Sequence, residues 1–127
     1  MAAPNILAAT TATPHTVSIT PADTSRNALV TAPSSGSAQK INEIIVANID
    51  GTTAYDATIE LRLADGTTYR AIASTISVPP DASLIVSDKT TMFYLLDTSV
   101  TGEASTLWAT SSTASKLTYT VSYETVS

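Results

Sequence analysis

Few side chains in this sequence could do acid-base or nucleophilic chemistry, and their spacing matches no catalytic motif. His15 is the sole histidine, cysteine is absent, and no G-x-S-x-G nucleophile motif occurs. A nucleophilic triad needs a base close to its nucleophile. We therefore interpret His15 as a surface or interface residue, expect no enzymatic activity, and predict no cofactor.

The acidic residues are the other candidates for chemistry, and most of them occupy expected turns or strand ends. Aspartate is favoured there because its side chain hydrogen-bonds the local backbone. Asp50 and Asp56 flank one turn and could share a calcium ion, but the dense run of oxygen ligands typical of calcium loops is missing. We predict no metal site, with calcium as the open alternative. Glu60 alternates with Arg62 and is interpreted as a surface charge.

Three aromatic residues, Phe93, Tyr94 and Trp108, allow two interpretations. A sugar-binding platform would need exposed rings. A large ring buried between the layers of a small sandwich would instead stabilise the fold. We favour the second for Trp108 and expect it to fill the core.

Composition excludes several functional classes. Serine and threonine make up about a third of the 127 residues, only 13% are charged, and the net charge is −5. The six Lys and Arg residues are scattered, whereas nucleic-acid binding needs clustered positive charge. Neither nucleic acid nor an anionic membrane is expected as a partner. No apolar run approaches the roughly 20 residues of a membrane span, and the start lacks the basic region of a secretory signal.

Short alternating segments separated by turns predict an all-β fold. Regular spacing of about 8–12 residues per strand is typical of an antiparallel β-sandwich, Ig-like or jelly-roll-like. Lys40–Ile49 is apolar on both faces and should be a central strand, and Asp65-Gly66 predicts a type I′ hairpin turn. The expected strands are His15–Thr20, Asn27–Thr31, Lys40–Ile49, Asp56–Leu63, Thr68–Val78, Ser83–Ser87, Met92–Leu96, Thr106–Thr110 and Lys116–Thr125.

The N-terminal residues differ in composition from the rest. Residues 2–13 are mainly alanine and threonine, with Pro4 and Pro14 at either end. We interpret residues 1–13 as an extended arm that packs on a neighbour and residues 14–127 as the sandwich domain. A disordered end is an equally good interpretation.

Three blocks of the sequence resemble a known group of proteins. They are KINEIIVANIDG at 40–51, ISVPPDASLIV at 76–86, and the ending that includes VSYE at 121–124. The pattern, which covers about residues 38–127, is similar to that of small virion structural proteins of tailed bacteriophages. It is a pattern of strands and turns, and the Thr-rich stretch at 89–99 departs from the Gly-Asp turn common in the group.

The resemblance implies a capsid decoration (cement) protein or a component of the neck or tail. An acidic chain suits the outside of a DNA-filled shell, so we expect decoration of the outer capsid surface, with the major capsid protein and a homotrimer as partners. A neck or tail-fibre module and a carbohydrate-binding adsorption module are the alternatives. The expected contacts are the arm and two loop tips, with the residues Pro4, Asn5, Ile6, Leu7, Thr10, Thr13, Asp50, Tyr55, Lys89, Phe93 and Tyr94.

Overall fold

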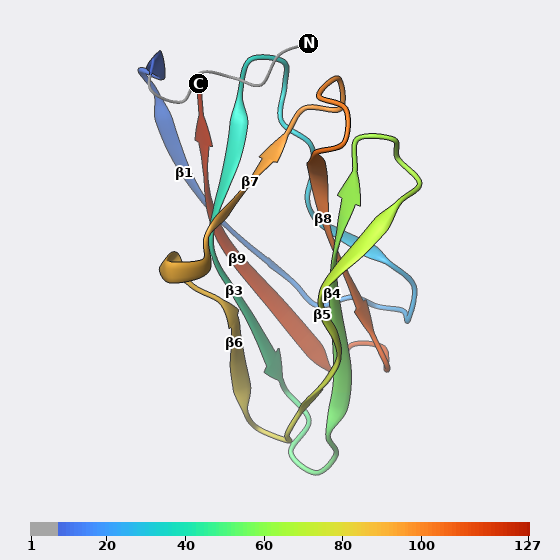
Figure 1. Ribbon diagram of the computed structural model, residues 1–127. Helices are drawn as coiled ribbons and strands as arrows, with labels where there is room; N and C mark the ends of the chain where they lie inside the picture. Colours follow the sequence, from blue (N-terminus) through green and yellow to red (C-terminus); the bar gives the residue numbers. More distant parts are fainter. Residues whose placement is uncertain (1–7) are drawn as a thin grey trace.

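Nine β-strands form two antiparallel sheets packed face to face in the computed structural model, which describes residues 8–127 (Figure 1). The first sheet has the order β1-β9-β3-β6, with β7 also paired to β3, and the second has the order β2-β8-β4-β5. The all-β sandwich predicted from the alternation is confirmed. The strands are β1 (Ala12–Ile19), β2 (Asn27–Val30), β3 (Ala38–Asn48), β4 (Tyr55–Leu63), β5 (Tyr69–Val78), β6 (Ser83–Ser87), β7 (Phe93–Leu96), β8 (Ala104–Ser111) and β9 (Leu117–Val126).

The one helical element longer than a single residue between positions 8 and 127 is the short 3₁₀ segment η2 (Lys89–Thr91), which joins β6 to β7. Asp88 caps this segment, accepting a hydrogen bond from the Thr90 amide at 2.9 Å. Across the described residues, no helix is long and apolar enough to span a lipid bilayer.

Strand β3 is central, as its apolar composition predicted. It pairs with β9 along one side, and with β6 and β7 in succession along the other. Its residues Ile41, Ile44 and Val46 are fully buried between the sheets. A strand that is paired on both sides and covered on one face exposes little of its surface to water, so apolar residues are tolerated along its whole length.

The core is built by alternate residues of strands from both sheets. On β9 the buried side chains are Leu117, Tyr119 and Val121, and on β8 they are Leu107 and Ala109. The intervening residues point away from the core because side chains alternate along a strand. The remaining core members are Leu29, Val30, Ile41, Ile44, Val46, Ala57, Ile59, Val78 and Leu95.

The β4–β5 hairpin differs from the type I′ turn predicted for it. A type I′ turn requires positive φ at both central residues, but within this turn only Gly66 has positive φ, at 76°. The Gly66 amide donates to the carbonyl of Leu63 at 3.0 Å, and Leu63 donates to Thr68 at 2.9 Å. The turn over Leu63–Gly66 ends in a left-handed glycine, the arrangement common in longer hairpin loops.

The N-terminal boundary also differs from the prediction. Ala12 and Thr13, assigned to the arm, belong to β1, and Thr10 and Thr11 donate to the carbonyl of Ser127 at 2.9 and 3.0 Å. The ladder extends this far because β9 continues to Val126 and supplies partners for it. Residues 1–7, the first part of the predicted arm, lie outside the described residues.

Candidate interaction site

The outer surface of the first sheet carries rows of hydroxyl groups from β1 and β9. Ser18 lies opposite Thr120, and Thr16 lies opposite Ser122. The Ser18 and Thr120 hydroxyl oxygens are 3.2 Å apart, and those of Thr20 and Thr118 are 2.7 Å apart. These rows arise because threonine or serine occupies every second position in both strands, while the positions between them face the core.

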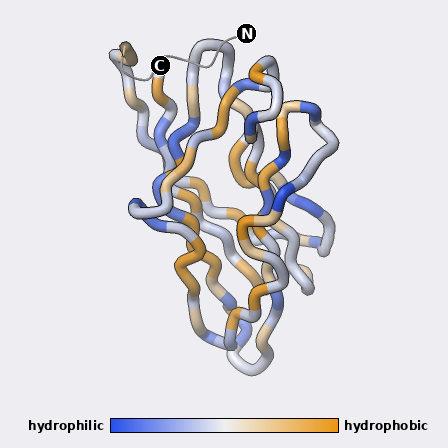
Figure 2. Tube along the Cα trace, in the orientation of Figure 1, coloured by the Kyte–Doolittle hydropathy of each residue, from blue (hydrophilic) through white to orange (hydrophobic). Residues whose placement is uncertain are grey.

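The surface continues across β3 and β6 as an apolar patch. Ile45 is the cross-strand partner of Thr120 on one side and of Ile85 on the other. Ile85 is 65% exposed, because its neighbours Leu84 and Val86 turn toward the core. Figure 2 colours β6 mainly as hydrophobic. We call this surface the hydroxyl face; it comprises Thr16, Ser18, Thr20, Ile45, Ala47, Ser83, Ile85, Thr118, Thr120 and Ser122.

The residues of the hydroxyl face carry no charge, but charged side chains lie directly beside them, and Glu43 is the cross-strand partner of Ser122. Glu43 and Glu124 lie toward one end, while Lys116 and Asp50 pair at the other with a nitrogen–oxygen distance of 3.8 Å. Apolar residues bordered by polar groups are the usual composition of a protein–protein contact. A flat sheet surface suits another macromolecule better than a small ligand, which needs a concave site.

The residues predicted as contacts do not converge on one site. Thr10 and Thr13 are exposed beside the C-terminus, whereas Asp50 lies in the β3–β4 loop and Tyr55 begins β4, at the opposite end of the sandwich (Figure 1). Lys89 lies on η2, at the side of the first sheet. The predicted arm residues Pro4, Asn5, Ile6 and Leu7 are outside the described residues.

Phe93 and Tyr94 are half-buried strand residues rather than members of an exposed loop tip. Both lie in β7, where they pair with Ile41 and Lys40 of β3. Phe93 packs against the hydrophobic core. Neither ring is fully free to contact a partner.

The carboxylate of Asp50 accepts hydrogen bonds from neighbouring residues of the chain. Its Oδ1 accepts hydrogen bonds from the Thr52 amide and hydroxyl at 2.8 and 2.9 Å and from the Thr53 amide at 3.1 Å. Its Oδ2 accepts from the Tyr55 hydroxyl at 3.2 Å. The bonds from Thr52 are the main cause of a pKa of about 2, well below the ordinary value of this carboxyl. Between residues 8 and 127, no three His, Cys, Asp or Glu side chains cluster where they could hold a metal ion, and both carboxylate oxygens of Asp50 accept hydrogen bonds from its own loop.

Trp108 does not fill the core as predicted, but lies on the outer surface of the second sheet. Its neighbours Leu107 and Ala109 are buried between the sheets, so Trp108 points the other way. Its ring meets Tyr69 edge-on, with centroids 6.2 Å apart, and the guanidinium of Arg62 lies 4.9 Å from its centroid. The sequence shows that Trp108 lies on the opposite side of its strand from Leu107 and Ala109. It does not show which of these two sides the first sheet covers.

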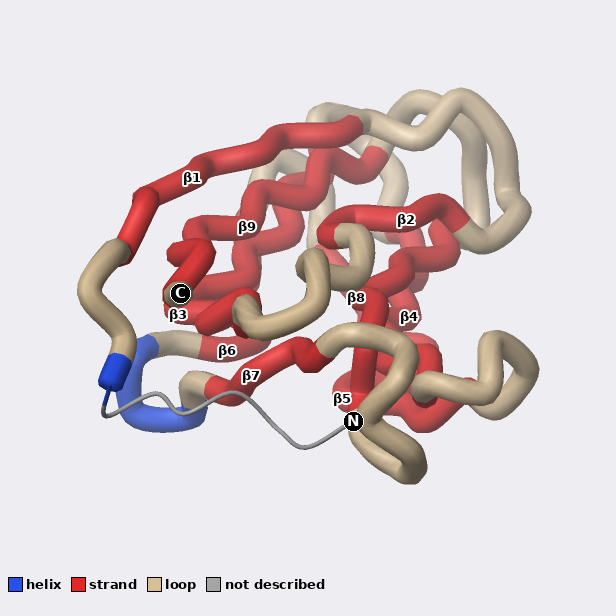
Figure 3. The backbone as a smooth tube through the Cα atoms, turned by 90° about the horizontal axis from the view of Figure 1, so that it is seen from above, coloured by secondary structure: helices blue, strands red, loops and turns tan. Residues whose placement is uncertain are grey.

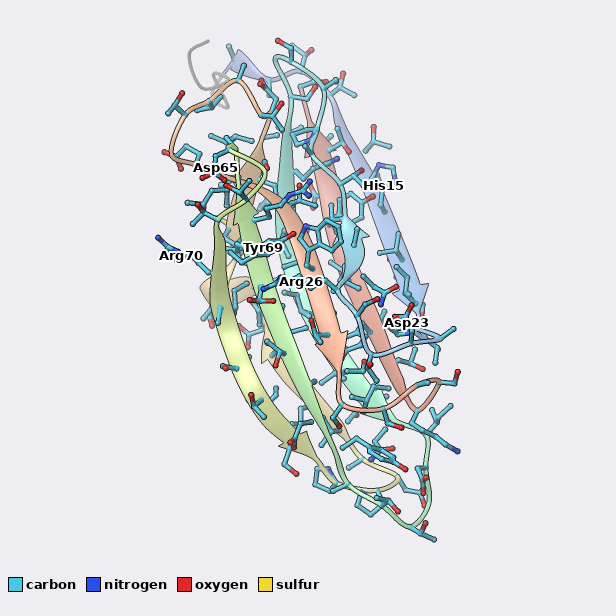
Figure 4. The ribbon with its side chains drawn as sticks, turned by 90° about the vertical axis from the view of Figure 1, so that its right-hand side faces the viewer. His15, Asp23, Arg26, Asp65, Tyr69 and Arg70 are labelled. Atoms are coloured by element: carbon cyan, nitrogen blue, oxygen red, sulfur yellow. The ribbon has the colours of Figure 1, made fainter. Side chains whose placement is uncertain are left out.

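A second arginine covers the other ring of this cluster. The Arg26 guanidinium lies 3.7 Å from the Tyr69 centroid, and its Nε is 3.0 Å from the carboxylate of Glu60. Figure 4 shows Arg26 extending across the sheet to Tyr69. The cluster therefore packs against itself, and its rings do not form the open platform that stacking on a sugar would require.

No protein-family model and no curated protein matches the chain. Among solved structures, it is similar to T=1 particles derived from infectious bursal virus, with 19% identity and a TM-score of 0.36, over 89% of this chain and 31% of that one. It is also similar to the VP2 subviral particle of infectious bursal disease virus, with 22% identity and a TM-score of 0.34, over 89% and 32%. The chain thus spans about a third of the length of these proteins. Similarity at this level gives no information about the activity of the chain.

Proposed function

We propose that this chain is a non-enzymatic virion structural protein of a tailed bacteriophage that decorates the outer capsid surface and binds major capsid subunits. The observation that supports this most directly is the hydroxyl face, an uncharged surface with Ile45 and Ile85 in adjacent strands. The resemblance of residues 38–127 to small phage virion proteins supports the same role.

The charge distribution fits this placement. The chain carries a net charge of −5, yet the hydroxyl face itself is neutral. A negative molecule is repelled by packaged DNA and is suited to the exterior. A neutral contact surface with an apolar patch can bind a shell subunit without desolvating charged groups.

Binding to shells that lack the protein tests the proposal. Ile85→Lys puts a charge in the apolar patch of the hydroxyl face at a side chain that is already 65% exposed, so folding should be preserved. We expect this variant to lose co-sedimentation with shells. Ile72→Lys is the matched control, because Ile72 is 37% exposed but lies on β5 of the other sheet. Unchanged shell binding by Ile85→Lys would refute the use of this face.

Copy number separates decoration from the neck or tail alternative. Quantitative protein analysis of intact particles should give hundreds of copies for a decoration protein and about a dozen or fewer for a neck or tail component. The repetition of contacts over a symmetric shell favours a homotrimer, and sedimentation of the purified protein measures the number of copies. The carbohydrate-binding alternative predicts that cell-wall glycans protect Trp108 fluorescence from a quencher, whereas decoration predicts no change.

A further inference from the structure

Strand β1 has a free edge in the described sandwich. β1 bonds to β9 on one side only, and Figure 3 shows it running along the outside of the molecule. It is eight residues long and pairs with β9 without any register shift. Edge strands of this kind present unpaired amide and carbonyl groups that can bond to another chain.

The other edges are shorter or irregular. β2 and β7 have four residues each and β6 has five. β5 is long, but its register against β4 shifts twice, Thr75 has a positive φ of 54°, and Arg70 adds a charge. Bulges, short length and charge are the usual features that keep edge strands from pairing. β1 lacks all three.

The hydrogen-bond pattern identifies which β1 groups are free. Thr11 and Ser127 bond to each other in both directions. Backbone bonding alternates along an antiparallel ladder. The N–H and C=O groups of the odd-numbered residues of β1 therefore bond to β9, and those of the even-numbered residues point away from β9, toward the free edge. Among residues 8–127, the backbone groups of this edge left without a partner are therefore those of Thr16 and Ser18, followed by Thr20. Pro14 falls at an outward position, where its missing N–H costs nothing within the sheet.

The side chains along this edge also allow close approach of an identical strand. No Asp, Glu, Lys or Arg occurs among residues 1–22, the first being Asp23. The side chains of Val17 and Ile19 face the core and are half-buried. The side chains of Thr16 and Ser18 lie on the outer face of the sheet and end in hydroxyl groups. Two such strands can meet without like charges facing each other, and each would cover apolar surface of the other.

We propose that the Thr16–Thr20 edge of β1 pairs antiparallel with the same edge of a second copy about a two-fold axis. The contact uses the same surface on both molecules and closes with two copies. It joins the two first sheets into one and places their hydroxyl faces side by side. It gives a dimer in place of the trimer predicted from shell symmetry, and it does not depend on the virion role.

Sedimentation of the full chain with a proline variant tests this pairing. Ser18→Pro removes an outward N–H, and Pro14 already shows that this strand accepts proline at an outward position. We expect the wild type to dimerise with increasing concentration and Ser18→Pro to stay monomeric with unchanged circular dichroism. Ser18→Ala, which loses the hydroxyl but keeps the N–H, should dimerise like the wild type. Ile85→Lys should also dimerise, which separates this contact from shell binding.

Amide hydrogen exchange locates the contact and remains informative if the proline variant unfolds. In the dimer, the amides of Thr16 and Ser18 should become protected as concentration rises, while those of β5 should not change. A monomeric or trimeric wild type would overturn the proposal. So would a dimer in which these two amides exchange as fast as in the dilute protein, because another edge, the N-terminal residues or a face would then form the contact.

Discussion

The guanidinium carbon of Arg62 lies 4.9 Å from the centre of the Trp108 ring on the outer surface of the second sheet. Both side chains are half-buried, and a cation over an indole ring is most favourable where water is partly excluded. Trp108 is the single tryptophan of the chain, so its fluorescence reports on this contact directly.

Replacing Arg62 should uncover Trp108. We expect Arg62→Ala to lower the free energy of unfolding by about 1–2 kcal/mol, to shift tryptophan emission to the red and to increase quenching by acrylamide. Arg70→Ala is the control, because Arg70 lies on the same sheet but bonds only to the carbonyl of Tyr69. Emission that is unchanged in Arg62→Ala would mean that Arg62 does not cover the ring in solution.

The hydroxyl of Tyr119 should contribute measurably to stability. It lies 2.8 Å from Ser111 Oγ and donates to the carbonyl of Thr110 at 3.2 Å, in a region where Tyr119 and Ser111 are buried. Tyr119→Phe leaves these groups without their partner and should cost about 1–2 kcal/mol in urea unfolding. Ser111→Ala should cost less, because the Thr110 bond survives. Equal stability of Tyr119→Phe and wild type would contradict the bonding described.

Stability should fall in acid as two loop aspartates become protonated. Asp50 and Asp65 each have a pKa of about 2, held low chiefly by hydrogen bonds from Thr52 and Thr68, respectively. A pKa lowered by folding stabilises the protein above the unfolded value, about 3.9, and that stabilisation is lost as pH falls toward 2. Thermal unfolding between pH 5 and 2 should show this decline.

Asparagine variants test which carboxylates cause the decline. Asp50→Asn and Asp65→Asn should each be less stable than the wild type near pH 5 and should approach it near pH 2. Asp56→Asn is a suitable control, since the carboxylate of Asp56 accepts none of the loop hydrogen bonds that hold Asp50. A parallel pH profile for all four proteins would contradict the assignment.

The β4–β5 turn should depend on the glycine at its end. Gly66 has φ of 76°, and nothing lies within 4 Å of the position that a Cβ would occupy. The cost of Gly66→Ala is therefore one of backbone conformation, about 1–2 kcal/mol. Gly66→Asn should cost less, because asparagine adopts this conformation more readily than alanine. Chemical denaturation of the two variants provides the comparison, and equal losses would argue against a left-handed residue 66.

Local patterns in the sequence were sufficient to predict the strands. Alternation placed Tyr119 and Val121 on one side of the last strand, and both are buried. The apolar stretch at 40–49 predicted the central strand, which the structure confirms as β3. These predictions succeed because side-chain direction in a strand depends only on the residue's own position.

The arrangement of the hydroxyl face could not be predicted in the same way. The alternating Thr and Ser residues of the first and last strands are plain in the sequence, but Ser18 and Thr120 are 102 residues apart. That these strands are neighbours is decided by sheet topology, which depends on which pairings bury the core best. The contacts predicted on the arm and loop tips rest on local composition, which does not show which strands are neighbours.

Trp108 shows the same division between local pattern and tertiary structure. The sequence of this strand establishes that Trp108 lies on the opposite side from Leu107 and Ala109. It does not establish which side the other sheet covers, because that is settled by the packing of Leu107 and Ala109 against strands distant in sequence. Periodicity is a property of a few neighbouring residues, whereas burial is a property of the whole assembled sandwich, and only the tertiary structure therefore decided where the surfaces of this protein lie.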